Sequence, residues 1–420
     1  MKLFKILIFS FCILVVISQT TFAQDRLRIS LLTITPGAEL NDVFGHSALR
    51  VVDSNSVTDH VYNYGIFPFY EPNFYFKFIK GQLRYSVEIE NYTEFVSYYQ
   101  QMKRGTTEQV LNFSAEEKRN IKNFLNENIK EENKYYQYDF FKDNCTTRLR
   151  DIIQKNHSPA PAMPAVMPTT FTYRNAIHQY LDKGNMYWGK LGIDILLGAK
   201  TDAVMTTNEQ EFLPDNLMKA LDATKNTPIV SSSNQVYELE KAAEEKVYFT
   251  PMVFSISLLL FFILINFIKS RHSSSSPWGR LGGAFSWGRL GGAFSLEGLG
   301  EAVALFFDRL LFFIVGLLGI VLIFMWFGTD HIMTKNNYNL LWASPLFIVY
   351  AFVLNKKSVL VKRFSLAAAI FLSLILCTWF FLPQQLNVAL IPIVVLLVWR
   401  LAAKYFTQRN KDNGGQSKLV

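Results

Sequence analysis

The chain has 420 residues, of which 50% are apolar and 15% aromatic, and its formal net charge at pH 7 is +8. That apolar content is high for a soluble protein, and long apolar runs after residue 247 predict a membrane domain. The positive charge gathers in segments between those runs, where membrane topology explains it. It therefore does not indicate nucleic-acid binding.

Residues 1–23 have the pattern of a secretory signal peptide. Two lysines precede an apolar run, and the small-residue sequence "TFA" before Gln24 is a cleavage site. An uncleaved anchor helix is the alternative interpretation. In both cases, residues 24–246 are predicted to form one exported domain, and its length is enough to bury a hydrophobic core.

The exported domain begins with segments typical of β-strands: 27–34, 46–53, 60–67 and 82–90. The turn-rich sequence "DSNS" between the second and third predicts a hairpin. Ser114, with Glu117 three residues later, forms a capping-box signature, and the apolar spacing after it predicts a helix to about residue 130. Residues 157–168 contain too many prolines for anything but a loop.

Cys145, in the stretch "DNCTTRLRD", is the only cysteine of the exported domain, because Cys12 belongs to the signal and Cys377 to a membrane run. This count excludes a disulfide framework. Asp143 and Asn144, directly before Cys145, are strong helix N-cap residues. The sequence therefore predicts that a helix starts at the cysteine.

The predicted helix places Leu149, Ile152 and Ile153 on the same face as Cys145, so the thiol is expected to point toward the core. A cysteine in the first turn feels the positive end of the helix dipole, which lowers its pKa, and its backbone N–H can face an oxyanion. These features favour a nucleophile. The alternative is a small buried hydrophobic residue, the common fate of a free cysteine.

A thiol nucleophile needs a histidine base, and the exported domain offers His46, His60, His157 and His178. His46 is favoured because it starts a strand directly after Gly45. A glycine there allows close approach of another backbone, and a strand holds the imidazole rigidly. His60 lies on a neighbouring strand, His157 beside the proline-rich loop and His178 on a predicted helix.

Asn63 is the candidate for orienting the imidazole. If the hairpin turns near residues 55–56, Asn63 lies on the neighbouring strand and on the same face as His46. His60 is the alternative orienting residue, although it is expected on the other face. No metal-binding or nucleotide-binding motif occurs in the sequence, so we expect no metal ion and no cofactor.

Five apolar runs are long enough, or nearly so, to cross about 30 Å of hydrocarbon: 247–268, 306–327, 338–354, 364–382 and 386–402. Lysine and arginine gather in segments 269–303 and 355–363 and in the tail 403–420, whereas the alternate loops hold only Lys335. By the positive-inside rule, the basic segments face the cytoplasm and the exported domain lies outside.

Two further features fall in the membrane part. Asp330 and His331, in "GTDHIMTKNNYN" at the outer end of the second run, are candidates for binding a lipid headgroup or closing over the active site. An ordinary interfacial loop is the alternative.

The sequence "WGRLGGAFS" occurs at 278–286 and again at 287–295. This repeat favours a tandem duplication in a tolerant cytoplasmic loop over a membrane-surface element.

The order of the motifs, with a histidine on a strand and a later "NC" at a helix start, resembles the circularly permuted papain-like fold of the lecithin:retinol acyltransferase group and NlpC-type proteins. More specifically, "PGAELNDVFGHSALRV", "VYNYGIFPF", "FFKDNCTTRLRDII" and "GTDHIMTKNNYNLLWASP" resemble an inner-membrane family of Bacteroidota. The resemblance covers about residues 27–402. It implies an α+β fold, with a permuted papain-like periplasmic domain over 24–246 and an all-α bundle of about five transmembrane helices over 247–402.

Members of that family include the lipoprotein N-acyltransferases of Bacteroides type. The resemblance implies that Cys145 accepts an acyl chain from a membrane phospholipid as a thioester. The chain would then pass to the α-amine of a lipoprotein's diacylglyceryl-cysteine, with His46 as general base and Asn63 orienting it. The alternatives are a membrane-tethered papain-like peptidase or amidase acting on cell-wall peptides, and a non-enzymatic sensor or scaffold. A tether needs only one span, so five predicted spans favour a lipid substrate.

Overall fold

The computed structural model describes residues 26–67, 70, 72–225, 228–238, 247–273 and 296–416. The predicted signal peptide and the tandem repeat lie outside these residues. The chain divides into two compact units. The sheet unit consists of Met1–Phe74, Leu83–Thr169 and Met205–Lys241, and the helical unit consists of Tyr75–Gln82, Thr170–Val204 and Ala242–Val420.

The sheet unit is built on an antiparallel sheet with the order β6-β4-β3-β2-β1-β5-β7. Its strands are β1 (Leu27–Ile34), β2 (His46–Asp53), β3 (Thr58–Ile66), β4 (Arg84–Asn91), β5 (Thr106–Leu111), β6 (Tyr135–Gln137) and β7 (Val230–Tyr237). The four predicted strands and the β2–β3 hairpin are confirmed.

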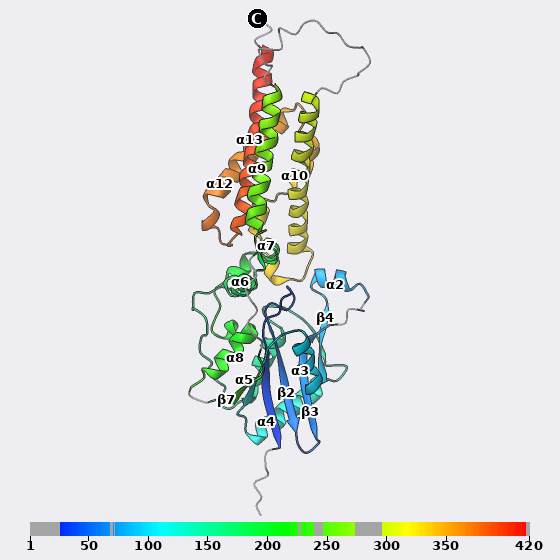
Figure 1. Ribbon diagram of the computed structural model, residues 1–420, viewed down its shortest axis with the longest axis vertical. Helices are drawn as coiled ribbons and strands as arrows, with labels where there is room; N and C mark the ends of the chain where they lie inside the picture. The colour runs from blue at the N-terminus through cyan, green and yellow to red at the C-terminus, as the bar shows by residue number, and fades with distance from the viewer. Residues whose placement is uncertain are drawn as a thin grey trace, which may run out of the picture. The chain divides into compact units, whose positions relative to one another are not determined.

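Helices cover both faces of this sheet, and the alternation of each strand decides which residues meet which helices. Their bounds are α3 (Tyr92–Gln101), α4 (Ala115–Asn128), α5 (Cys145–Asn156), η2 (Asn208–Phe212) and α8 (Pro214–Asp222). Ile29 and Leu31 of β1 pack with α4, α5 and α8, whereas Leu32 and Ile34 pack with α3. Figure 1 shows α3 lying over β2 and β3 on its own face of the sheet.

The predicted helix after Ser114 is confirmed as α4. The Ser114 side chain accepts a hydrogen bond from the Glu117 backbone N–H, and the Glu117 carboxylate accepts one from the Ser114 N–H, which completes the capping box. Ile121 and Leu125 are the buried residues of this helix. The capping residues therefore fix where α4 begins, and its apolar stripe fixes which side faces the sheet.

The helical unit contains long helices and short turns: α2 (Phe74–Lys80), α6 (Tyr173–Lys183), α7 (Tyr187–Leu196), η1 (Ala199–Asp202), α9 (Pro251–Ser273), α10 (Leu296–Phe327), η4 (Ile332–Thr334), η5 (Tyr338–Leu341), α11 (Leu346–Val353), α12 (Val359–Cys377), η6 (Trp379–Phe381), η7 (Val388–Leu390) and α13 (Ile391–Gln416). Its core is formed by apolar residues of α9 to α13, with the α7 residues Leu191 and Ile195 packed against it. Residues 170–204, which the sequence analysis placed in the exported domain, cluster with these helices.

The five predicted spans are not confirmed as a set. In the described residues, three segments are long and apolar enough to cross a membrane, namely Glu301–Phe327, Val359–Cys377 and Val388–Arg409, and Pro251–Phe267 is a shorter apolar helix. The predicted run 338–354 contains the turn η5 and the eight-residue helix α11. Eight residues rise about 12 Å, against about 30 Å of hydrocarbon. Pro345 at the N-cap of α11 explains the interruption, because proline disfavours helix in the residue before it.

Candidate active site

Cys145 is the first residue of α5, as the sequence predicts, and Asn144 is the N-cap. The Asn144 carboxamide oxygen accepts from the Thr147 N–H at 2.8 Å, and its amide nitrogen donates to the carbonyls of Phe140 and Phe212 at 2.7 and 2.9 Å. Asp143 does not cap the helix, because it forms an ion pair with Arg148. Asn144 thus holds the start of α5 to two other segments.

The thiol lies inside the protein, in agreement with the prediction. Cys145 is 8% exposed, and Leu149, Ile152 and Ile153 on the same helix are buried in one cluster with it. The neighbouring Thr146 hydroxyl hydrogen-bonds the Ser47 hydroxyl at 3.1 Å, which ties α5 to β2 next to His46. Burial is expected both for a nucleophile and for a cysteine that only packs in the core. The residues around the sulfur therefore distinguish the two.

His46 is the immediate neighbour of the sulfur. It lies close enough to Cys145 for each group to shift the pKa of the other, and its Nε2 donates to the Asn63 carboxamide oxygen at 2.7 Å. Because Nε2 is engaged by Asn63, Nδ1 is the ring nitrogen that faces the thiol. The structure therefore brings together the three residues that the sequence analysis singled out: Cys145, His46 and Asn63.

Electrostatics favours an ion pair between the thiol and the imidazole. Burial by itself raises the pKa of Cys145, but the charge and hydrogen bond of His46, with hydrogen bonds from the Ser47 backbone and Thr146, lower that pKa to about 7. Burial by itself lowers the pKa of His46, but the charge of Cys145 and the hydrogen bonds to Cys145 and Asn63 raise it above its ordinary value. A thiolate is the nucleophilic form of cysteine, so both shifts favour reactivity near neutral pH.

Gly65 lies next to Cys145. Strand alternation places His46 on the sheet face that α3 covers, whereas α5 packs against the opposite face. A Cβ built on Gly65 would lie 3.8 Å from the Cβ of Cys145, and its φ of +93° is a conformation that glycine adopts most readily. A methyl group at this position would touch Cys145 at an ordinary van der Waals distance, so the positive φ is what favours glycine here.

Gly45 explains the close backbone approach that the sequence analysis predicted before His46. Its φ is +82°, and a Cβ there would lie 2.8 Å from the backbone oxygen of Ile34. A side chain at this position would push β2 away from β1, where Ile34 pairs with His46. Gly45 thus permits the register that holds the imidazole in place.

Two residues near His46 were not foreseen from the sequence. Glu90 accepts a hydrogen bond from the Asn63 amide nitrogen at 2.6 Å, and Tyr99 of α3 stacks on the imidazole with ring centroids 6.2 Å apart. Glu90 lies on β4, where Val61 pairs with Glu90 and Asn63 with Glu88. Only the register between β3 and β4 places Glu90 diagonally beside Asn63, and a single sequence does not reveal that register.

The other candidate histidines lie elsewhere. His60 pairs with Val51 and Asn91 in the sheet, one residue out of phase with Val61 and therefore on the other face, as expected. His157 follows α5, and its Nδ1 lies 2.9 Å from the Pro159 carbonyl oxygen. His178 is buried in the helical unit, where its Nε2 donates to Asp194 at 2.8 Å. None of them forms part of the Cys145 site.

Asp330 and His331 belong to the helical unit and contact the segment around α2. The Asp330 N–H donates to the Lys80 carbonyl at 2.8 Å, and the Asp330 carboxylate accepts from the Gln82 amide at 2.8 Å. Nε2 of His331 lies 3.2 Å from the Phe78 carbonyl oxygen. Their role in substrate binding stays a prediction. Among the described residues, no group of three His, Cys, Asp or Glu residues is placed to hold a metal ion.

The two units define a membrane protein whose sheet domain carries a buried thiol–imidazole pair. Models of two protein-family domains match the chain in the same order: the Lnb N-terminal periplasmic domain matches residues 16–179, and the Lnb transmembrane domain matches residues 297–412. The chain belongs to this Lnb-like family, which confirms the resemblance drawn from the sequence. No curated protein and no solved structure matches it.

Family membership supports three conclusions, on the location of the N-terminal domain, on the membrane and on the class of protein. The N-terminal domain is periplasmic, and the helical part associates with the lipid bilayer of the inner membrane. The family indicates a membrane enzyme that modifies lipoproteins. Family membership does not specify the reaction or the roles of individual residues. The arrangement of Cys145, His46 and Asn63 limits which reactions are possible.

Proposed function

We propose that the chain is a cysteine-dependent acyltransferase that moves an acyl chain from a phospholipid, through a thioester on Cys145, to the α-amine of a diacylglyceryl-cysteine lipoprotein. The observation that carries the proposal is the position of Cys145 beside His46, whose Nε2 donates to Asn63 at 2.7 Å. It supplies a nucleophile, a base and an orienting group in one place. The lipid and the lipoprotein are chosen because the family indicates an enzyme acting on lipoproteins at the membrane.

In the first half-reaction, His46 holds the thiol proton and the Cys145 thiolate attacks the ester carbonyl of the phospholipid. A C–S bond forms and the ester C–O bond breaks. The leaving alkoxide takes the proton from His46 and departs as a lysophospholipid. Asn63 keeps Nε2–H of His46 hydrogen-bonded, so Nδ1 stays directed at the sulfur throughout.

In the second half-reaction, the lipoprotein amine attacks the thioester carbonyl while His46 accepts the proton of the amine. A C–N bond forms, the C–S bond breaks, and the thiolate–imidazolium pair is restored. No oxidant or reductant is needed, so the cycle requires only the two lipid substrates. The low pKa of the Cys145 thiol also makes the thiolate a good leaving group in this step.

The proposed topology places both substrates within reach of one enzyme. The signal peptide and the basic segments 269–303, 355–363 and 403–420 favour a catalytic domain of about residues 24–246 in the periplasm and a C-terminus in the cytoplasm. A phospholipid of the outer leaflet and a lipoprotein of the same membrane then face the catalytic domain. A helical membrane domain suits lipid substrates better than a single anchor would.

The test is mass spectrometry of a lipoprotein N-terminus from cells that produce the wild type, Cys145→Ser or His46→Ala. We expect loss of N-acylation in both variants. Cys377→Ser is the matched control, because Cys377 is exposed on α12 and takes no part in the site. Normal N-acylation in both site variants would refute the proposal, and altered cell-wall peptides with normal acylation would favour a peptidase or amidase.

A further inference from the structure

The helical unit contains a second polar site that the proposed chemistry does not use. A cavity of about 340 Å³, called here the α7–α9 cavity, is lined by residues of α6 and α7, by the start of α9 and by the segment before α13. They include His178, Asp182, Lys190, Thr250, Met252 and Val388. Its volume lies in the range of small-ligand pockets, which is about 300–1,000 Å³.

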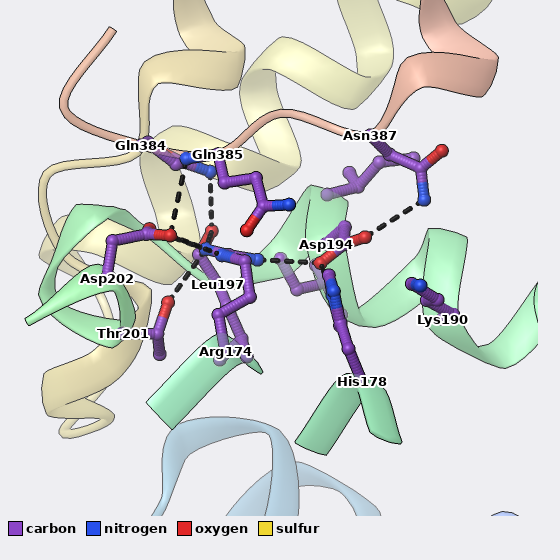
Figure 2. A network of polar contacts seen from close by, with 12 residues as sticks. Arg174, His178, Lys190, Asp194, Leu197, Thr201, Asp202, Gln384, Gln385 and Asn387 are labelled. Carbon is purple, nitrogen blue, oxygen red and sulfur yellow. Dashed lines mark hydrogen bonds and ion pairs between the residues drawn. The ribbon is translucent and has the colours of Figure 1, made fainter. Parts of the chain in front are cut away.

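One wall of the cavity holds a buried, hydrogen-bonded carboxylate. Asp194, 1% exposed, accepts hydrogen bonds from Arg174 at 2.7 Å, from His178 at 2.8 Å and from Asn387 at 2.9 Å. Figure 2 shows these three side chains converging on Asp194. Arg174 is shared between Asp194 and Asp202, so one guanidinium faces two carboxylates in this cluster. A ligand must therefore bring its own positive charge to this side of the cavity.

Arg174 fixes His178 in place through Asp194. Its guanidinium is fully buried and also donates to Asp202 at 2.9 Å and to Thr201 at 2.7 Å. His178 is 9% exposed and lines the cavity, and its Nε2 is engaged by Asp194. Nδ1 is therefore the ring nitrogen of His178 that can contact a ligand in the cavity.

The lining of the cavity also carries one cation and one anion. Lys190 donates to the two carboxylate oxygens of Asp182 at 2.8 and 2.7 Å. Their side chains are 21% and 48% exposed, so solvent screens this ion pair and it contributes little to stability. A ligand that brings its own anion and cation can replace the pair at little cost and leave both residues compensated. A purely anionic ligand would leave Asp182 unpaired beside it.

The surroundings place the cavity at the boundary between membrane and water. Thr250, Pro251 and Met252 are its lining residues at the start of the apolar helix α9. Next to them, Trp188 donates to the Phe249 carbonyl at 2.9 Å and packs its ring against that of Phe249 at 5.5 Å. Tyr248 and Phe249 are 82% and 60% exposed. Exposed aromatic residues of this kind mark the level of lipid headgroups.

We propose that the α7–α9 cavity holds the zwitterionic headgroup of a membrane phospholipid, with its phosphodiester at Lys190 and His178 and its ammonium group at Asp182. In the proposed topology α9 is the first apolar helix after the periplasmic domain, so a cavity at its start faces the outer leaflet. The inference rests on the proposed function only where it identifies this lipid with the acyl donor. Binding itself does not require Cys145 chemistry.

The test uses the full chain with Cys145→Ser, which holds no acyl chain, in detergent micelles. Native mass spectrometry measures the affinity for phosphatidylethanolamine, which is zwitterionic, and for phosphatidylglycerol, which is anionic. We expect phosphatidylethanolamine to bind more tightly. Lys190→Gln should weaken its binding about tenfold, the loss expected for one charge-assisted hydrogen bond. Asp182→Asn should abolish the preference between the two lipids.

Two further variants keep the result interpretable. Lys183→Gln removes an exposed lysine of α6 that does not line the cavity, and it should bind phosphatidylethanolamine like the parent protein. Val388→Trp adds bulk at a lining residue that is 47% exposed, and it should block binding without a change of charge. Equal affinities for the two lipids in the parent protein, or equal effects of Lys190→Gln and Lys183→Gln, would overturn the inference.

A competition experiment separates a lipid headgroup from free phosphate. Glycerophosphoethanolamine should displace the bound lipid, and inorganic phosphate at the same concentration should not. Displacement by phosphate alone would show an anion site and refute the lipid assignment. If the cavity variants bind normally while Cys145→Ser abolishes acylation in cells, this inference fails and the proposed function stands. If binding behaves as expected but acylation does not depend on Cys145, the proposed function fails alone.

Discussion

Glu90 accepts a hydrogen bond from the amide nitrogen of Asn63 at 2.6 Å, and this contact decides which end of the Asn63 side chain faces His46. With the nitrogen held by Glu90, only the carboxamide oxygen is available to the imidazole, and it accepts from Nε2 at 2.7 Å. The proton on Nε2 leaves Nδ1 free to take the thiol proton. Glu90 is thus a positioning residue that acts on His46 through Asn63.

We predict that Glu90→Ala lowers kcat of acyl transfer about tenfold and leaves KM for the phospholipid nearly unchanged. A tenfold loss corresponds to about 1.4 kcal/mol, in the range of a hydrogen bond to a charged group. Glu90→Gln can still accept from Asn63 and should recover most of the activity. The measurement is steady-state kinetics of purified full-length protein in lipid–detergent micelles.

Glu88→Gln is the matched control for the Glu90 variant. Glu88 lies two residues earlier on the same strand face and is the cross-strand neighbour of Asn63. Its carboxylate accepts from Ser86 at 2.9 Å and forms an ion pair with Lys134, whereas the Asn63 amide donates to Glu90. Its replacement should leave kcat unchanged. Equal losses in Glu88→Gln and Glu90→Ala would mean that the negative charge of the strand matters, and that the orientation of Asn63 does not.

We predict that alkylation of Cys145 by iodoacetamide increases with pH and has its midpoint near 7, because His46 and hydrogen bonds lower the pKa of the thiol to about 7. In His46→Gln the positive charge is lost while burial remains. The midpoint should therefore move above the ordinary thiol value of about 8.5. Peptide mass spectrometry quantifies Cys145 in a Cys377→Ser background, and the apparent pKa belongs to the coupled pair.

This titration separates a nucleophile from a packing cysteine. A thiol that is only buried would have its midpoint above the ordinary value in the wild type, and the His46 variant would not change it. Asn63→Ala gives an intermediate expectation, because the imidazole keeps its contact with the thiol but loses the hydrogen bond that raises its own pKa. Its midpoint should lie between those of the wild type and His46→Gln.

Local patterns in the sequence were sufficient to predict the hairpin and the start of α5. The predicted segments 27–34 and 46–53 coincide with β1 and β2, because alternation and flanking turn residues act over a few neighbours. The edge strand β7 was missed. Its sequence "VSSSNQVY" is mostly polar and exposed, so it is a strand only because it pairs with β5, which lies far from it in sequence.

The difference between local and long-range contacts also explains which residues of the two polar sites could be predicted. Asn63 could be placed beside His46 because a tight hairpin fixes their register. The Asp194 cluster could not be predicted, because Asn387 lies 193 residues away from its partner in sequence. Residues 170–204 also look like part of a soluble domain by composition, and only their contacts with α9 to α13 place them in the helical unit.

We predict that Gly65→Ala destabilises the sheet unit by about 1–2 kcal/mol, the cost of a left-handed conformation for a residue with a Cβ. Its φ is +93°, and the new methyl group would also contact Cys145. Activity should fall more than stability does, since the methyl group lies beside the reacting sulfur. Gly192→Ala is the control: it lies in α7 with nothing within 4 Å of the added Cβ, and alanine should stabilise that helix. Thermal unfolding and acylation rates measured on both variants check this expectation.

Glu211 provides the last prediction, which concerns stability and pH. It is 1% exposed, and neither of its carboxylate oxygens has a hydrogen-bond partner in the described structure. Burial raises the pKa of Glu211 to about 7, although the charge of Arg150 lowers it in part. The folded protein therefore holds this proton more tightly than the unfolded chain does.

Because the folded pKa of Glu211 is the raised one, its contribution to stability is fully present below the unfolded pKa of about 4.3 and is lost as pH rises to about 7. Glu211→Gln is permanently neutral, so it should raise Tm at pH 8 and change it little at pH 4. Intrinsic fluorescence of the full-length protein in detergent follows the unfolding. Glu132→Gln, at an exposed turn, is the control and should give the wild-type pH profile. An equal gain in Tm at both pH values would show that the buried carboxylate is not ionised at pH 8. That result would contradict a pKa of about 7 for Glu211.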